Sequence, residues 1–374
     1  DGEDGASGPC GFAVFSLGKL GGRELNYSSD IDLMFFYRGR GRTSGPRPVE
    51  NHDFHRKPAH QCVTLPPTYT AEGQCYRVDL RLRPEGRQGD VCLSLAAARN
   101  YYQQRARDWE LQMLIKARVS AGDPALGRDL LDSLEPRIYS TTLDFSAVET
   151  MSATRERINE KMAARSGWTA GFDIKLARGG IRDIEFLVQC LQRLHGGREP
   201  WVRHGGSLLA LFRLRDKSLL SDSEYSRLAS AYQFLRTLEH RLQFADDLQT
   251  HALPSAQEDL ELVARKMPPA ELGGPPTAET LLRELNRHLE EVQDLYERVI
   301  HAQQPMYYSA VLAGGAAAAA WPVETGGAGS EGSPSNLIRF LDQKAPRLAA
   351  EVSACGMRRG HRLFEHFLEQ VLPQ

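Results

Sequence analysis

The amino-acid sequence predicts an α+β fold, in which a small sheet near the start of the chain is followed by an all-helical bundle. Residues 11–17 and 31–37 are short apolar runs rich in aromatic and branched side chains, as in strands buried on both faces. Residues 75–84 alternate apolar with polar side chains, which indicates a half-buried strand. From Asp123 onward the apolar residues recur at helical spacing, most clearly over residues 181–194.

A glycine-rich turn joins the first two predicted strands and is followed by paired aspartates. Gly18, Gly21 and Gly22 would let the backbone approach an anion closely. Asp30 and Asp32 are two positions apart, so on a strand both side chains point to one face. Like charges held side by side at the end of a buried strand cost stability unless a cation lies between them. Carboxylate oxygens are typical ligands of magnesium, so the pattern predicts a Mg²⁺ site.

A third aspartate strengthens this prediction, because an isolated Asp-x-Asp pair is more often a polar strand end. Asp79 lies within the alternating segment, and three arginines share its face of the predicted strand: Arg77, Arg81 and Arg83. A carboxylate flanked by arginines can complete a metal site and bind phosphate oxygens. We therefore expect Asp79 to lie beside Asp30 and Asp32 in one sheet, close enough to share a metal ion.

The chain resembles the glutamine synthetase adenylyltransferase family, within the nucleotidyltransferase superfamily that includes DNA polymerase β. The resemblance extends from about Gly11 to Pro254 and rests on motifs in the family's order: LGKLGGRELNYSSDIDL, YRVDLRLRPEG, DWELQMLIKAR and GGIRDIEFLVQ. Members of this family carry two similar halves, one that adds AMP to a tyrosine of glutamine synthetase and one that removes it. Residues 108–110 (DWE), 115–118 (IKAR) and 179–182 (GGIR) look more like the removing half.

The resemblance implies a small mixed-sheet nucleotidyltransferase domain that removes AMP by magnesium-dependent phosphorolysis, giving ADP. It implies glutamine synthetase as protein substrate, control by a PII-type signal protein, and a cytoplasmic location. The implied catalytic and metal-binding residues are Asp30, Asp32 and Asp79. The expected nucleotide and phosphate contacts are Gly18, Lys19, Gly21, Gly22, Ser28, Ser29, Arg81, Arg83, Lys175 and Arg182. For Lys175 and Arg182, an ion-pair network between domains is an equally good interpretation.

Two other kinds of function stay open at this point. One is the reverse enzymatic reaction, ATP-dependent adenylylation of glutamine synthetase, or uridylylation of a signal protein. The other is a non-catalytic regulatory or binding fragment, favoured by the lack of the upstream helices expected in the family and by the prolines of residues 51–67. A net charge of −2 argues against broad nucleic-acid binding, and no apolar run has the length of a membrane span. The six cysteines are scattered, with no Cys-x-x-Cys, as in reduced cytosolic proteins.

Composition divides the chain into five segments. Residues 1–10 are expected to be a disordered, polar tail, 11–122 the nucleotidyltransferase domain and 123–304 the helical bundle domain. Residues 305–335 are an Ala/Gly-rich linker, and 336–374 begin a further helical segment. Helices are expected after a cap at Ser94, from Asp123-Pro124, and over 146–165, 181–194, 207–218, 221–247 and 277–301.

Three stretches allow competing interpretations. Pro58, Pro66 and Pro67 predict that residues 51–67 form a poor helix, since proline removes a backbone donor. The same stretch contains four possible zinc ligands: His52, His55, His60 and Cys62. Their spacing fits no standard zinc motif, so we interpret the stretch as a surface segment with incidental histidines and not as a metal site.

The other two ambiguous stretches contain charged residues of the helical regions. Lys116 and Arg118 either reach the cleft or form a solvated basic face. Glu239-His240 lacks the His-Glu-x-x-His pattern of zinc proteases, so it is interpreted as part of a packed polar helix.

Overall fold

The computed structural model describes residues 8–71, 73–139, 172–244 and 249–302. Within them, a mixed five-stranded sheet is followed by a group of helices, which confirms the α+β fold class. The strands are β1 (Phe12–Ser16), β2 (Asp30–Tyr37), β3 (Arg77–Asp79), β4 (Cys92–Ser94) and β5 (Arg118–Gly122). Along the sheet the order is β3-β2-β1-β5, with β4 also paired to β2. β1 is antiparallel to β2 and β5, whereas β3 and β4 run parallel to β2.

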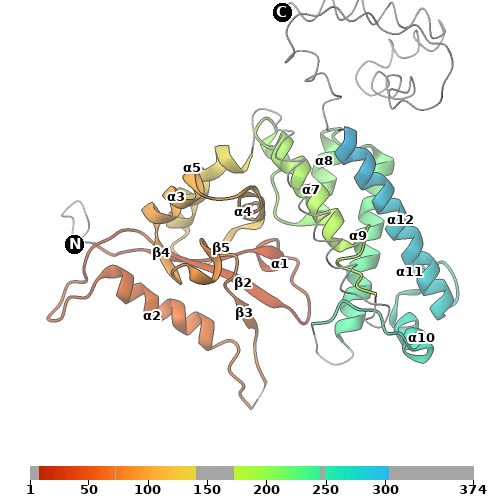
Figure 1. The fold of residues 1–374 in the computed structure, drawn as a ribbon, viewed down its shortest axis with the longest axis horizontal. Helices are drawn as coiled ribbons and strands as arrows, with labels where there is room; N and C mark the ends of the chain where they lie inside the picture. Colours follow the sequence, from red (N-terminus) through yellow and green to blue (C-terminus); the bar gives the residue numbers. More distant parts are fainter. Residues whose placement is uncertain (1–7, 72, 140–171, 245–248, 303–374) are drawn as a thin grey trace, which may run out of the picture. The chain divides into compact units, whose positions relative to one another are not determined.

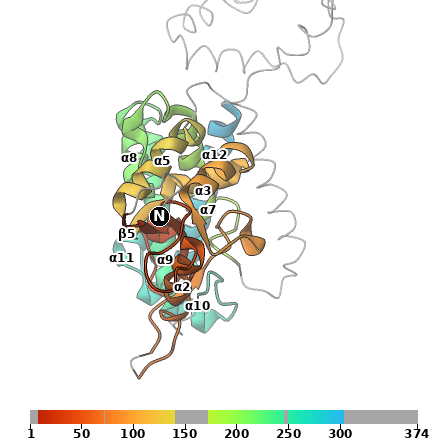
Figure 2. The same cartoon turned by 90° about the vertical axis from the view of Figure 1, so that its left-hand side faces the viewer.

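Alternate residues of the two central strands face two separate hydrophobic clusters. Phe15 and Phe36 pack with the helices α3 (Leu95–Gln104), α4 (Asp108–Met113) and α5 (Pro124–Ile138). On the opposite face, Val14 and Phe35 pack with α2 (Asn51–Thr64). Figures 1 and 2 show α2 on one side of the strands and α3 and α5 on the other. The predicted boundary at residue 122 therefore falls between two elements, β5 and α5, that belong to the same layered unit.

The helix α2 forms despite Pro58, so the expectation that residues 51–67 would form a poor helix is wrong. A proline inside a helix costs about 3 kcal/mol. Here the buried positions recur every four residues at Asn51, His55 and Ala59. The His55 ring stacks on Phe12 and Tyr37, with ring centroids 5.5 and 5.3 Å apart. Packing of this face against the sheet offsets the local penalty, and the helix still ends before Pro66.

The predicted strand over residues 75–84 is shorter than expected, because only Arg77–Asp79 pairs with β2. The chain turns directly afterwards, with Glu85 and Gly86 both at positive φ. Val78 and Leu80 still pack against the cluster on the α2 side, as the alternation predicts. Beyond Asp79 the alternation no longer describes a strand, since the backbone leaves the sheet.

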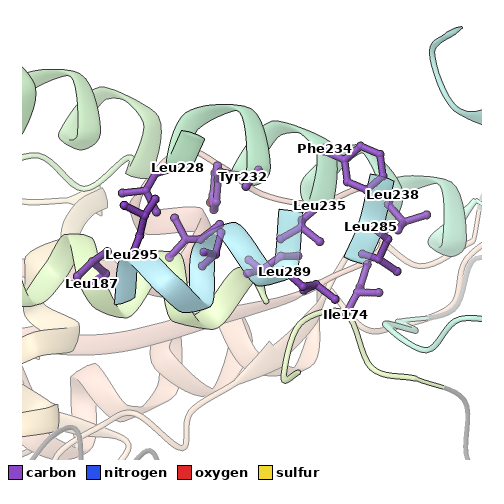
Figure 3. Close-up of a cluster of buried hydrophobic side chains, with 14 of the residues drawn as sticks. Ile174, Leu187, Leu228, Tyr232, Phe234, Leu235, Leu238, Leu285, Leu289 and Leu295 are labelled. Carbon is purple, nitrogen blue, oxygen red and sulfur yellow. The ribbon is translucent and has the colours of Figure 1, made fainter. Parts of the chain in front are cut away.

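The helices after residue 172 share a single hydrophobic cluster. They are α7 (Ile181–His195), α8 (Ser207–Asp216), α9 (Asp222–Gln243), α10 (Gln257–Lys266), α11 (Pro269–Leu272) and α12 (Ala278–Ala302). Figure 3 shows Leu187 of α7, Leu228 and Leu235 of α9, and Leu285 and Leu295 of α12 meeting in this cluster. Burying a leucine contributes about 1.5–3 kcal/mol, so these contacts hold the bundle together.

Shorter elements complete the described part of the chain. The helix α1 (Gly18–Gly21) forms the glycine turn, and 3₁₀ turns cover Gly86–Gln88, Leu114–Lys116 and Pro200–Val202. Several expectations lie outside the described residues: the helix over 146–165, the linker 305–335, the segment 336–374 and most of the tail 1–10. Among the described helices, none combines the length and apolar character that crossing a membrane requires. The described cysteines, Cys10, Cys62, Cys75, Cys92 and Cys190, are free thiols.

Candidate active site

The three predicted carboxylates come from adjacent strands of the sheet. β2 and β3 run parallel with Asp32 opposite Asp79 and Asp30 opposite Arg77. Paired residues of neighbouring strands direct their side chains to one face, so Asp30, Asp32 and Asp79 share a face of the sheet. This register confirms the expectation that the Asp79 strand lies beside β2. That the three side chains share a metal ion stays a prediction.

The carboxylates differ in how their charge is balanced. Arg77 Nε donates to Asp30 Oδ1 at 2.6 Å, and Arg81 Nε donates to Asp79 Oδ2 at 2.6 Å. Asp32 forms no ion pair with any residue in the described ranges. Burial, followed by the charges of Asp79 and Asp30, raises the pKa of Asp32 to about 6. Asp32 is therefore the carboxylate whose ionised form most needs an added cation.

The donor set fits a hard divalent cation, although the side chains are turned toward arginines. Within the described ranges, no three His, Cys, Asp or Glu side chains are already arranged to hold a metal ion. Asp30 and Asp79 each direct an oxygen to an arginine instead. Three carboxylates on one face, with Asp32 in no ion pair with a described residue, are the chemistry that magnesium prefers.

The glycine turn lies directly against Asp32. Gly18 has a φ of +52°, and a Cβ added to it would lie 2.7 Å from Asp32 Oδ2. A side chain at this position would displace the carboxylate, so the close approach requires glycine. The other two glycines pack against backbone: a Cβ on Gly21 would collide with the Lys116 carbonyl oxygen, and one on Gly22 would lie 2.6 Å from the Gly205 carbonyl oxygen.

The remaining residues of this turn are held by other parts of the protein. Lys19 Nζ donates to Glu239 Oε1 of α9 at 2.7 Å, and the Lys19 side chain is only 11% exposed. Ser29 Oγ donates to the Asp30 carbonyl oxygen at 3.0 Å, and Ser28 is buried. The phosphate-binding roles predicted for Lys19, Ser28 and Ser29 stay predictions.

Arg81 and Arg83 have different surroundings. Arg81 is bound to Asp79 through both its backbone N–H and its side chain, and the side chain is 65% exposed. Arg83 donates to the carbonyl oxygens of Leu80, Arg87 and Gly89. Arg83 therefore organises the loop after β3, whereas Arg81 remains beside the carboxylates. Phosphate binding by either arginine stays a prediction.

The segment before α7 contributes one cation to the site. Lys175 lies close enough to Asp32 and Lys19 to influence the pKa of both groups. Arg182 is exposed in the first turn of α7. Asp173 accepts from the N–H groups of Lys175 and Leu176, so it shapes this turn. Of the two predicted contacts, Lys175 is thus the one whose charge acts on Asp32, and phosphate binding by Lys175 or Arg182 stays a prediction.

The two interpretations of Lys116 are both wrong, because the side chain is buried in an ion-pair network. Lys116 Nζ lies 3.3 Å from Glu24 Oε2 and 3.1 Å from Glu185 Oε1. Burial lowers the pKa of Lys116, but Glu185 and Glu24 outweigh it and the net pKa is raised. Arg118 also turns away from solvent, and donates to the carbonyl oxygens of Leu20 and Gly21.

Sequence reasoning missed the carboxylates that join the glycine turn to the helices. Glu24, at the end of the turn, accepts from Ser207 at the start of α8 and from Tyr232 of α9. Glu239 is fully buried in α9, which confirms the packed polar helix but adds the contact with Lys19. The sequence does indicate that Glu239 is buried, because it follows Leu235 by four residues and so lies on the apolar face of the helix.

Two family models match different parts of the chain. Residues 2–133 match a family model described as glutamate-ammonia ligase adenylyltransferase. Residues 149–300 match a model described as GlnD PII-uridylyltransferase. The chain is 39% identical over 302 residues to a protein of Thioalkalivibrio sulfidiphilus, an alignment that covers 81% of this chain and 30% of the relative. It is 43% identical over 256 residues to a protein of Stenotrophomonas maltophilia, covering 68% of this chain and 27% of the relative.

A protein of Hahella chejuensis is also 43% identical, over 255 residues that cover 68% of this chain and 26% of the relative. Each of these relatives is named a bifunctional glutamine synthetase adenylyltransferase/adenylyl-removing enzyme. The chain thus spans less than a third of the length of the curated relatives that it matches.

Proposed function

Because this chain belongs to the glutamine synthetase adenylyltransferase family, we propose that it removes AMP from the adenylylated tyrosine of glutamine synthetase by phosphorolysis. The products are ADP and the free tyrosine. The observation that carries the proposal is the register of β2 and β3, in which Asp32 is opposite Asp79 on the face that also bears Asp30. The approach of Gly18 to Asp32 supports a phosphoryl group bound at the same place.

Asp30, Asp32 and Asp79 would hold the divalent cation, which is Mg²⁺ in this proposal. When bound, the cation neutralises phosphoryl oxygens and so favours attack on phosphorus. Lys175 and Arg81 supply positive charge beside the carboxylates and would orient the incoming phosphate. Because Gly18 has no side chain, the turn lies directly against Asp32, and its backbone would be close to an AMP phosphate bound at the carboxylates.

The bond changes of the proposed reaction need little help from a base. An oxygen of inorganic phosphate forms a bond to the phosphorus of AMP, and the bond from that phosphorus to the tyrosine oxygen breaks. The tyrosine oxygen leaves with a proton, which inorganic phosphate can supply because it carries one at neutral pH. The role of the chain is then to align phosphate with the phosphorus and to hold the developing negative charge.

The direction of transfer and the partner are parts of the proposal that need a direct test. The DWE and GGIR motifs favour removal of AMP, as in the family's removing half. The match of residues 149–300 to a PII-uridylyltransferase model supports a second candidate, transfer of UMP to a PII-type signal protein. Under the first candidate, such a signal protein would act as a regulator. We place either reaction in the cytoplasm, where free cysteines stay reduced.

Product analysis distinguishes these functions. The chain is incubated with adenylylated glutamine synthetase, phosphate and Mg²⁺, and ADP and the mass of the synthetase subunit are measured. We expect ADP and unmodified synthetase, without any need for ATP. Release of pyrophosphate from ATP with unmodified synthetase would instead identify adenylylation, and labelling of a PII-type protein from UTP would identify uridylylation. A chain inactive in all three assays would contradict a catalytic role.

A further inference from the structure

Glu239 lies at the centre of a buried group of charges contributed by three segments. The side chain is fully buried in α9. Its Oε1 accepts from Lys19 Nζ at 2.7 Å and lies 3.0 Å from His251 Nδ1. Its Oε2 accepts from Arg236 Nη1 at 2.6 Å. Both oxygens of Glu239 are therefore occupied by groups that hold its charge in place.

The Lys19 contact leads directly to the candidate active site. Lys19 follows Gly18, whose backbone lies against Asp32 Oδ2. Leu17, the residue before Gly18, donates its N–H to the Asp32 carbonyl oxygen at 3.0 Å. Glu239 is thus connected to Asp32 through one ion pair and the short backbone segment Leu17–Lys19.

A second contact from the same helix holds the other end of the glycine turn. Arg236, one helical turn before Glu239, donates through Nη2 to the Glu24 carbonyl oxygen. Arg236 is itself held by Glu239, so α9 binds the turn at both Lys19 and Glu24. Gly205, in the loop before α8, packs against Gly22 between these two points. The turn is consequently fixed by the helical bundle as well as by the sheet.

Loss of the Glu239 charge would have a directional effect. Lys19 and Arg236 would remain as buried cations without their shared partner, which is unfavourable. The Glu185 carboxylate also interacts with the Lys19 charge, so the Lys19 ammonium would shift toward Glu185 and leave the position in which Glu239 holds it. The turn would then move at the point where it touches Asp32.

We propose that Glu239 is a positioning residue: through Lys19 it holds the Gly18–Gly22 turn against Asp32, and so places the phosphoryl group that is transferred. The helix α9 is then part of the nucleotidyl-transfer site although Glu239 contacts no substrate. The expected effect on nucleotide binding rests on the proposed function. The placement of the turn by Glu239 rests on the contacts described above and not on that function.

The first experiment is a double-mutant cycle read out by binding of Mg²⁺·ADP to the whole chain. The variants are Glu239→Gln, Lys19→Met and the two combined. We expect each single change to weaken binding by about tenfold or more, and the double variant to be no weaker than the worse single variant. That pattern arises only if Glu239 acts through Lys19. Glu239→Asp, which keeps the charge on a shorter side chain, is expected to recover part of the loss.

Glu110→Gln is the matched control for the cost of removing a buried carboxylate. Glu110 is 4% exposed and accepts from Tyr101 and from the Arg107 N–H, in the part of the chain that packs on the sheet. We expect this variant to lower the melting temperature at least as much as Glu239→Gln, yet to change Mg²⁺·ADP affinity by less than about twofold.

Several outcomes would overturn the positioning role. They are unchanged or tighter Mg²⁺·ADP binding in Glu239→Gln, losses that multiply in the double variant, or an equal loss in the Glu110→Gln control. Amide hydrogen exchange provides a readout that is independent of the proposed function. Faster exchange over residues 18–24 in Glu239→Gln, and not in Glu110→Gln, is expected; unchanged exchange there would also reject the proposal. If the wild-type chain binds no Mg²⁺·ADP, the proposed function fails and the exchange result alone decides the positioning role.

Discussion

Asp32 and Asp79 lie directly opposite each other on parallel strands, although the helix α2 separates them in the sequence. The pair places two carboxylates side by side, with Asp30 on the same face. Of these, Asp32 forms no ion pair with any described residue, and its pKa is raised to about 6 by burial and then by Asp79 and Asp30.

Replacement of Asp32 by asparagine should abolish turnover and leave the fold at least as stable. The amide removes a metal ligand, but it also removes a charge that is repelled by its neighbours. Product formation and thermal unfolding measure the two effects. Asp132→Asn, at an exposed position of α5, is the control and should change neither. Near-normal turnover of Asp32→Asn in Mg²⁺ would rule out the metal-site assignment.

The same pKa shift predicts how the stability of the metal-free chain changes with pH. The folded-state pKa of Asp32, about 6, exceeds its ordinary value of 3.8, so the folded chain binds this proton more tightly. The contribution of Asp32 to the free energy of unfolding therefore falls as the pH rises from about 4 to above 6. Denaturant unfolding in EDTA should show this decline in the wild type relative to Asp32→Asn. Parallel pH profiles would contradict it.

Alanine at position 18 should displace Asp32 and reduce activity. The new Cβ would lie 2.7 Å from Asp32 Oδ2, and φ at Gly18 is +52°. The backbone strain costs about 1–2 kcal/mol for a non-glycine residue, and displacement of the carboxylate should add a loss of Mg²⁺-dependent turnover. Gly39→Ala is the control, because an added Cβ there meets nothing within 4 Å. Equal activity of the two variants would mean that the turn does not hold Asp32.

Replacing Arg81 by methionine should weaken phosphate binding, whereas replacing Arg83 by methionine should lower the stability of the fold. Arg83 makes hydrogen bonds to three backbone carbonyl oxygens of its loop, so its loss should destabilise the fold by about 1–3 kcal/mol. Arg81 is exposed and sits beside Asp79, so its loss should raise the KM for phosphate with little change in stability. Chemical denaturation and phosphate-dependent kinetics separate the two. An unchanged KM for phosphate in Arg81→Met would remove Arg81 from the binding site.

Lys116→Met should be strongly destabilising, by about 3–5 kcal/mol, because it leaves two carboxylates without their buried cation. The free energy of unfolding from denaturant titration measures the cost. Combining Lys116→Met with Glu185→Gln should recover part of this loss, because one of the unpaired charges is then removed. A change of less than about 0.5 kcal/mol would instead indicate a solvated lysine.

Local patterns in the sequence determined the kinds of element and the direction of individual side chains. Apolar runs identified β1 and β2, and alternation within β2 placed Asp30 and Asp32 on one face, because side-chain direction along a strand depends only on the local backbone. Helical periodicity likewise identified α7, α9 and α12 within a few residues. The four motifs were sufficient to identify the family, since their order and composition are specific.

The tertiary structure alone decided which distant groups meet. Pro58 is tolerated because His55 and Ala59 pack against a sheet face that the local sequence of α2 does not reveal. Lys116 is buried because Glu24 and Glu185 approach it from two other segments. The periodicity of apolar residues indicates which face of a helix or strand is buried, but not which other element packs against that face. It also does not indicate which residue forms an ion pair with a long charged side chain. The contact between Lys19 and Glu239, which are 220 positions apart in the sequence, depends on that packing.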